Sequence, residues 1–229
     1  MALSIAYEEQ YSALLEHVGS HCAELPAEVC LHWPMAEPTY NGRFMAIGQA
    51  LNGWMVERSS CQLWRPDYRQ GAIDGARRTS EIPTAWSWMP RQPWGRPFWR
   101  LVRSAMELCD VELSQIAWSN LAKVAPAEGR NPWGSLLEYQ IPIAGRLLRR
   151  EVSELDPAVV LIVSGRSYAA PFLSAAGFDV PWRRDGALQF DGQLDGRRWI
   201  VVNHPGTFAR RFEESWEAVQ RALGDQSSR

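Results

Sequence analysis

One short stretch limits the possible folds of this chain more than any other. Residues 158–163 read Ala-Val-Val-Leu-Ile-Val, an unbroken apolar run rich in β-branched side chains. A half-exposed strand alternates apolar and polar side chains, whereas a parallel strand that is covered on both faces is apolar throughout. Residues 158–163 are therefore predicted to form the central strand of an α/β fold.

Three further apolar runs lead into residues that can carry chemistry. They are residues 44–47, 116–119 and 199–202, which run into Gly48, Asn120 and His204 respectively. In an open α/β sheet, ligands bind beyond the carboxyl ends of the strands. We therefore expect Gly48, Asn120 and His204 to border one shared cleft.

Amphipathic patterns predict helices between these strands. The predicted helices cover residues 5–22, 98–108, 133–155, 168–176 and 208–223. The exposed side of the third is expected to carry Arg146, Arg149, Arg150 and Glu151. This alternation of helix and strand predicts an α/β fold, a three-layer α/β/α sandwich with a central, mainly parallel four-stranded sheet. Nothing in the sequence requires two domains, so residues 1–229 are expected to form one.

Turn-forming residues divide the rest of the chain. Residues 25–40 contain Pro26, Pro34 and Pro38 and are predicted to be a loop. Residues 185–195 are predicted to contain a small hairpin, because Asp195-Gly196 is a turn dipeptide. Residues 55–97 form an insertion rich in Trp, Arg and Pro, without a sustained period of either kind. A connection of this length is usually functional, so it is predicted to be a folded lid or binding loop.

Composition narrows the class of protein. Hydrophobic residues are 46% and charged residues 22% of 229 residues, as in ordinary globular enzymes. No apolar run approaches the roughly 20 residues of a membrane helix, and no signal-peptide pattern opens the chain. We therefore expect a cytoplasmic monomer that does not bind membranes. The net charge of -2 does not by itself indicate a nucleic-acid binder, although arginines cluster between residues 91 and 103.

The cysteines and histidines do not form a metal-binding pattern. The four cysteines, Cys22, Cys30, Cys61 and Cys109, are scattered and are predicted to be free thiols. His17 and His21 stand one helical turn apart but lack the glutamate of a zinc-protease helix. We expect neither a metal nor a cofactor.

The strand-end loops, taken in order, resemble the motifs of the uracil-DNA glycosylase superfamily. Residues 48–50 resemble its first motif, in which Gly-Gln opens the loop that shapes the base pocket. Residues 95–99 are similar to the segment that places an aromatic ring on the flipped base, and residues 119–124 to the strand end whose Asn reads the base edge. Residues 129–132 resemble the thermophilic, cluster-containing branch, and residues 204–206 the closing His-Pro-Ser motif.

The resemblance implies a hydrolase of DNA repair that cleaves the N-glycosidic bond of a flipped base, uracil or another deaminated or damaged one, in single- or double-stranded DNA. His204 would stabilise the charge on the departing base, and Asn52 would position water. The implied base-binding residues are Gly48, Gln49, Ala50, Phe98 and Asn120, of which Phe98 stacks and Asn120 reads the base edge. The implied phosphate-binding residues are Lys123, Arg130, Arg210 and Arg211.

The chain also departs from the family pattern. Ala50 stands where the best-known branch has a water-activating Asp, and Leu51 where proline normally follows. Gly206 replaces the usual Ser after His-Pro, and the cysteine spacing of the cluster-containing branch is missing. Ala50 and Leu51 favour an alternative, a non-catalytic module on the same scaffold that binds a nucleobase or nucleic acid.

Simpler interpretations of each residue remain open. His204 would then be an ordinary loop residue, Asn120 a cap for the next turn, and Gly48 a turn residue. A more distant alternative is a hydrolase-like or nucleotide-processing enzyme that uses His204 differently. The chain has no Gly-x-Ser-x-Gly sequence to support it.

Overall fold

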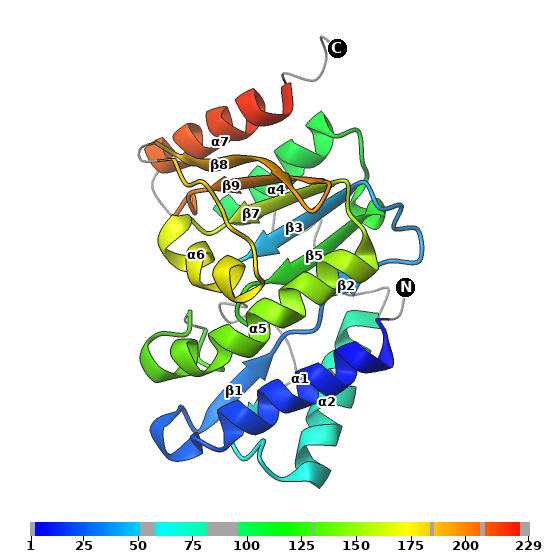
Figure 1. Ribbon diagram of the computed structural model, residues 1–229, viewed down its shortest axis with the longest axis vertical. Coiled ribbons are helices and arrows are strands. Elements are labelled where there is room, and N and C mark those ends of the chain that lie inside the picture. Colours follow the sequence, from blue (N-terminus) through cyan, green and yellow to red (C-terminus); the bar gives the residue numbers. More distant parts are fainter. Residues whose placement is uncertain are drawn as a thin grey trace.

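The α/β class is confirmed in the computed structural model (Figure 1). The structure describes residues 3–50, 58–81, 96–129, 131–183, 186–206 and 209–224. A six-stranded sheet has the order β2-β5-β3-β7-β9-β8. Its strands are β2 (Met35–Ala36), β3 (Phe44–Gly48), β5 (Ile116–Asn120), β7 (Val159–Val163), β8 (Leu188–Leu194) and β9 (Arg197–Val202). The sheet is thus larger than the four strands expected from the sequence.

The sheet is mixed, and its antiparallel strands lie at the edges. β3 pairs in parallel with β5 and with β7, and β7 pairs in parallel with β9. β2 and β8 each pair antiparallel with their one neighbour. The carboxyl ends of β5, β3, β7 and β9 therefore meet at one edge of the sheet, where ligands bind in open α/β folds.

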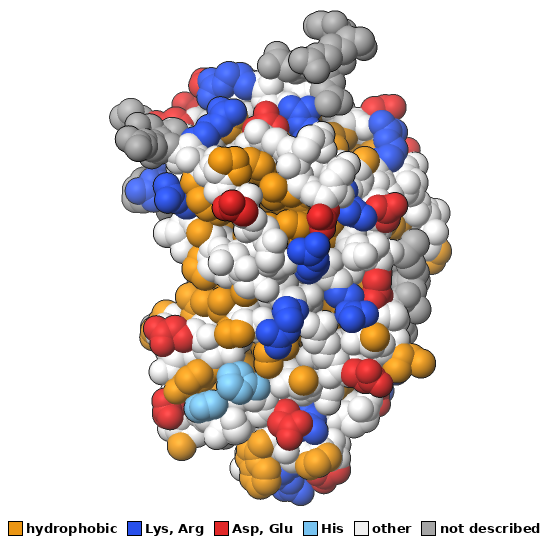
Figure 2. Space-filling view, viewed as in Figure 1, with side chains coloured by type: hydrophobic (Ala, Val, Ile, Leu, Met, Phe, Trp, Pro, Cys, Tyr) orange, Lys and Arg blue, Asp and Glu red, His pale blue; other side chains and the backbone are white. Residues whose placement is uncertain are grey.

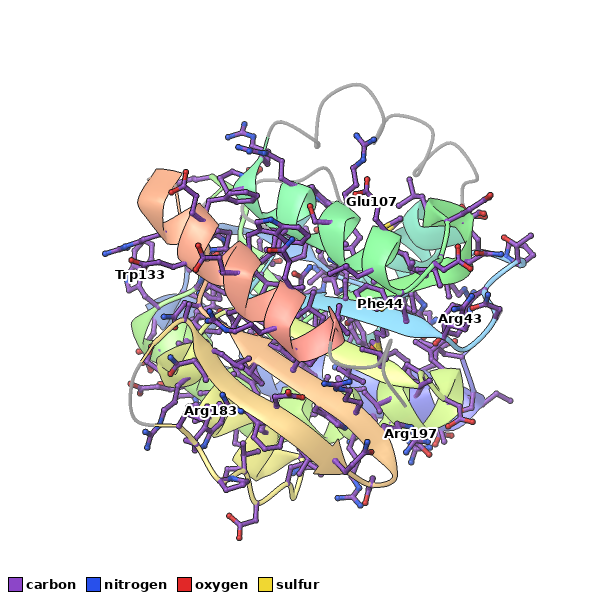
Figure 3. All side chains as sticks on the ribbon, turned by 90° about the horizontal axis from the view of Figure 1, so that it is seen from above. Arg43, Phe44, Glu107, Trp133, Arg183 and Arg197 are labelled. Carbon is purple, nitrogen blue, oxygen red and sulfur yellow. The ribbon has the colours of Figure 1, made fainter. Side chains whose placement is uncertain are left out.

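Helices cover both faces of the sheet because its inner strands are apolar on both sides. Phe44 and Ala46 of β3 pack with α4 (Pro97–Leu108) and α7 (Ala209–Gly224), which lie side by side in Figure 3. Met45 and Ile47 point the other way, toward α5 (Gly134–Leu155) and α6 (Arg166–Ala175). The predicted central strand, β7, is buried from Val160 to Val163.

A second, smaller sheet was not expected from the sequence. It has the order β4-β1-β6, built from β4 (Arg58–Ser60), β1 (Glu28–Leu31) and β6 (Val124–Pro126). α1 (Ile5–Gly19) and α2 (Pro66–Glu81) share a third apolar core with it. Short 3-10 helices lie at Cys22–Glu24 (η1) and Leu113–Gln115 (η3). The predicted loop at residues 25–40 was therefore wrong, since it contains β1 and β2.

Part of the predicted irregular insertion is regular structure. α2 begins at Pro66, a favourable first residue for a helix, and continues through Gly71 and Gly75 to Glu81. Its buried face contains Ala72 and Ile73, whose small combined surface gives a weak apolar period in the sequence. Residues 51–57 and 82–95 lie outside the described residues.

The predicted turn at Asp195-Gly196 is confirmed, but the hairpin extends beyond residues 185–195, because β8 pairs antiparallel with β9, which ends at Val202. Asp195 and Gly196 connect them with φ angles of 51° and 75°. Two successive positive φ angles define the tight turn that matches the twist of adjacent strands, and Asp-Gly is a favoured sequence for it.

Two further expectations can be compared with the structure. Cys61 is disulfide-bonded, which corrects the prediction that all four cysteines are thiols, whereas Cys30 and Cys109 are not disulfide-bonded. Within the described ranges, none of the helices combines the length and apolar character needed to cross a membrane.

Candidate functional site

Gly48, Phe98 and Asn120 converge at the carboxyl ends of β3 and β5. Gly48 and Asn120 are direct partners in the parallel register. A Cβ atom built on Gly48 would lie 2.4 Å from Oδ1 of Asn120 and 3.4 Å from Cε2 of Phe98. Gly48 is the last residue of β3 and is not among the glycines with a positive φ. Glycine is therefore required at this position for the close approach of two side chains rather than for a turn.

The Asn120 side chain is buried with an unused donor. Asn120 is 1% exposed, and its Nδ2 has no hydrogen-bond partner among the described residues. A buried donor without a partner costs about 1–3 kcal/mol, so such groups are rare in folded proteins. A residue that only capped the following turn would use its side chain in that cap. The unpartnered amide instead indicates a group that is held ready for a ligand.

Gln49 joins three segments of the site. Its Nε2 donates to the Ser164 carbonyl at 2.9 Å, and its Oε1 accepts from Nδ2 of Asn131 at 2.8 Å. Its carbonyl accepts the Ala122 amide at 2.9 Å. The Gln49 side chain is therefore structural. Asn131, which lies in the Gly-Arg-Asn-Pro sequence, holds it in place, a role that the sequence analysis did not assign.

Ala50 lies at the junction between the two main cores. It is half-buried and packs against both apolar clusters, on the α4 side and on the α5 side of the sheet. Its methyl group can shape a binding surface, but it cannot donate or accept a proton.

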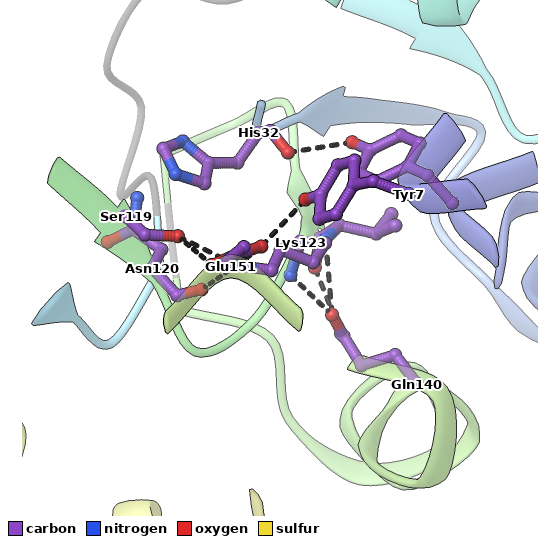
Figure 4. A network of polar contacts seen from close by, with 9 residues as sticks. Tyr7, His32, Ser119, Asn120, Lys123, Gln140 and Glu151 are labelled. Carbon is purple, nitrogen blue, oxygen red and sulfur yellow. Dashed lines mark hydrogen bonds and ion pairs between the residues drawn. The ribbon is translucent and has the colours of Figure 1, made fainter. Parts of the chain in front are cut away.

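A closed network of buried polar groups lies beneath Asn120 (Figure 4). The Lys123 ammonium donates to the Asn120 carbonyl at 2.6 Å, to Ser119 Oγ at 2.8 Å and to Glu151 Oε1 at 2.7 Å. Ser119 Oγ and Tyr7 OH each donate to the same carboxylate, at 2.7 and 2.6 Å. The side chains of Lys123 and Glu151 are both 0% exposed.

This network corrects two predictions. Lys123 was expected to hold a phosphate, but its ammonium is enclosed and its donors are used within the protein. Glu151 was expected on the exposed side of its helix and is instead the buried counter-ion. Burial lowers the pKa of Lys123, and the neighbouring Glu151 carboxylate partly opposes that shift. Burial, reinforced by Glu151, raises the pKa of Tyr7.

His204 lies at the same edge of the sheet but farther along it, because β7 separates β9 from β3. Its Nδ1 accepts the Gly206 amide at 3.1 Å, and Gly206 has a φ of 61° that favours glycine. Burial lowers the pKa of His204, so the ring is neutral near pH 7. With Nδ1 accepting, the proton is on Nε2. In the described part of the chain, no hydrogen bond joins His204 to Gly48 or Asn120.

The predicted phosphate-binding arginines are only partly described. Arg211 is exposed, and its Cδ would lie 3.8 Å from a Cβ built on Gly206, so it lies against the His204 loop. Asn52, Arg130 and the side chain of Arg210 lie outside the described residues. On the face seen in Figure 2, basic and acidic side chains are interspersed without a continuous basic patch. The described residues contain no His, Cys, Asp and Glu group suited to a metal ion.

His32 is a second buried polar residue that the sequence analysis missed. It follows β1, is almost fully buried, and its Nε2 has no partner among the described residues. Its ring lies 5.2 Å from that of Trp118, which belongs to the same face of β5 as Asn120. Burial, aided by the positive charge of Lys123, holds the pKa of His32 well below its usual value. Because residues 25–40 were predicted to be a loop, nothing in the sequence indicated a buried histidine there.

No protein-family model and no curated protein matches this chain.

Proposed function

We propose that this protein is a DNA glycosylase-like enzyme that hydrolyses the N-glycosidic bond of a flipped base. The observation that supports it most is the arrangement of Gly48, Phe98 and Asn120. An aromatic ring and an amide with an unpartnered donor both lie against a position where only glycine fits. A flipped base is bound by stacking and by hydrogen bonds to its edge, and these groups supply both.

The reaction breaks the bond between the base nitrogen and the sugar C1′, and the departing base takes the electron pair. A donor near a base oxygen stabilises that negative charge as it develops. His204 has the required form, since it is neutral and its proton lies on the nitrogen away from Gly206. Water then attacks C1′ and loses a proton. Asn52 remains our prediction for the residue that positions this water.

The arrangement of the parallel strands also supports the proposed function. β5, β3, β7 and β9 are joined by parallel pairings, and we propose that they form the central sheet of a glycosylase-type three-layer sandwich. Gly48 and Asn120 are the last residues of β3 and β5, and His204 follows β9. The uracil-DNA glycosylase superfamily, which the motifs resemble, remains part of this proposal.

DNA is the proposed partner. Arg211 remains a candidate for a phosphate contact because it is exposed beside the His204 loop. Phosphate binding by Arg130 and Arg210 remains a prediction, and Lys123 is no longer proposed to bind phosphate. A monomeric state and a cytoplasmic location also remain predictions. The disulfide at Cys61 argues against the latter, since disulfides are rare in the cytosol.

The test uses labelled oligonucleotides, single-stranded and duplex, that carry uracil, hypoxanthine or xanthine. After incubation, hot alkali cleaves the strand wherever a base has been released. We expect cleavage with at least one base and its loss in Asn120→Ala and His204→Ala. Asp191→Ala is a control, since it removes an ion pair with Arg198 in the β8–β9 hairpin, at the edge of the sheet away from Gly48 and Asn120. Cleavage that persists in Asn120→Ala would contradict the proposal.

A second candidate is a non-catalytic module that binds a nucleobase on the same surface. Ala50 favours it, because a methyl group stands where an activating carboxylate would be. Both polar atoms of the Gln49 side chain, Nε2 and Oε1, also already have hydrogen-bond partners within the protein. Tight binding of the same oligonucleotides without abasic product would select this alternative.

A further inference from the structure

The loop that carries Asn120 is fastened on two sides. On one side, the Leu121 amide donates to the Gly48 carbonyl and the Ala122 amide to the Gln49 carbonyl, both at 2.9 Å. On the other, Lys123 reaches back from the end of the turn to the Asn120 carbonyl. The backbone on either side of the Asn120 side chain is therefore held to β3 and to the buried network.

We infer that Lys123, with Glu151 as its counter-ion, is a positioning residue that orients the Asn120 amide toward a ligand. The ammonium is the only donor that the described residues give to the Asn120 carbonyl. It is itself held by Ser119 Oγ and by both carboxylate oxygens of Glu151, whose helix, α5, packs on the sheet. This inference rests on the proposed function.

Burying a charge pair is a costly way to satisfy one carbonyl. A well-packed apolar pair of similar volume is often as stable as a buried ion pair or more so. What the ion pair adds here is a fixed geometry. The Lys123 ammonium is held by acceptors on three residues, Ser119, Asn120 and Glu151. The Glu151 carboxylate is in turn held by Tyr7 and Ser119. Misplacement of a reacting group by about 1 Å can lower a rate about a hundredfold. A fixed Lys123–Glu151 pair, called the clamp below, therefore matters most where it positions a residue of an active site.

The experiment compares the full-length protein with two variants. Tyr7→Phe removes one hydrogen bond from Glu151 and none from Asn120, so it is the matched control. The triple variant Tyr7→Phe, Lys123→Met and Glu151→Leu removes the clamp without leaving a single charge buried. Circular dichroism and thermal unfolding identify the folded variants, and all measurements are made well below the unfolding temperature.

Amide hydrogen exchange tests the inference without any need for activity. In the triple variant, the Leu121 and Ala122 amides should exchange at least about tenfold faster than in Tyr7→Phe, while the amides of Ile162 and Val201 in the central sheet keep their rates. Unchanged exchange at Leu121 and Ala122 would overturn the inference, and equal acceleration in the whole sheet would show a general structural role instead.

Single-turnover base release connects the clamp to the proposed function. Relative to Tyr7→Phe, the triple variant should lose about tenfold to a hundredfold in rate at saturating protein, with little change in the concentration that gives half the maximal rate. A rate within twofold would overturn the inference. If the unmodified protein releases no base, the proposed function fails, and the exchange experiment still decides whether Lys123 positions Asn120.

Discussion

The carboxyl ends of β3 and β5 and the β8–β9 hairpin handle polar groups in opposite ways. In the hairpin, charged side chains lie near the surface in ion pairs: Arg198 binds Asp191 at 3.1 Å and Arg149 binds Asp195 at 3.0 Å. The one buried hairpin nitrogen without a partner in the described structure, Arg197 Nε, belongs to a side chain whose other nitrogens bind Asp195 and Asp156. At the β3–β5 ends, an ion pair is completely enclosed, and Asn120 keeps a buried atom without a partner in the described structure, as does His32, which follows β1 and lies beside Trp118 of β5. The interactions of the hairpin agree with its fold, whereas the buried polar groups at the strand ends lower stability, as polar groups at functional sites often do.

The largest expected effect is at the buried ion pair. Lys123→Met should lower the free energy of unfolding by about 3–5 kcal/mol, because it leaves the Glu151 carboxylate buried and unpaired. The triple variant, which replaces both charges, should lose less than the single one. Chemical denaturation measures both values. If Lys123→Met cost no more than a surface ion pair, about 0–1 kcal/mol, the contrast with the hairpin would be broken.

The next effect comes from the close approach at Gly48. Gly48→Ala places a methyl group against Asn120 Oδ1, and such overpacking costs about 1–3 kcal/mol. Base release should also be lost, because the amide must move. In the double variant Gly48→Ala and Asn120→Ala, stability should largely return while base release does not. Additive losses in the double variant, determined by denaturation, would show that the two residues do not clash.

Lowering the pH should reduce the stability of the protein through the buried side chain of His32, whereas the hairpin contains no histidine. Its pKa lies well below 6.5 in the folded protein, so as pH falls through about 6.5 the unfolded chain takes up a proton that the folded one does not. Stability is therefore lost as pH falls, by up to about 1.4 kcal/mol per pH unit. His32→Leu should reduce this slope by about one proton in denaturation curves measured between pH 6 and 5. Identical slopes in both proteins would mean that His32 titrates normally.

The sequence was informative where structure is local or repeated along the chain. The apolar run at Val159–Val163, the three strand ends and the Asp195-Gly196 turn follow from residue pattern and turn chemistry, and the structure contains all of them. The convergence of Gly48 with Asn120 also follows, because adjacent parallel strands end at the same edge of a sheet.

What the sequence could not provide depends on partners distant in the chain. Lys123 and Glu151 are 28 residues apart, and each alone resembles a solvated charge, so a periodic pattern places both outside the core. β1 and β2 are short and flanked by prolines, and α2 contains glycines and small residues, so their apolar periods are weak. Their burial is decided by the third core, which no local pattern describes.

The smallest expected effect separates function from stability most clearly. Asn120→Leu replaces a buried amide whose donor has no described partner with an apolar side chain of similar size, so stability should stay within about 1 kcal/mol or rise. Asp191→Ala in the hairpin instead removes a partner from Arg198 and should lower stability by about 1 kcal/mol. Thermal unfolding compares the two, and base release should be lost only in Asn120→Leu. A marked loss of stability in Asn120→Leu would mean that the amide already serves the fold, because a group kept for a ligand contributes little until the ligand arrives.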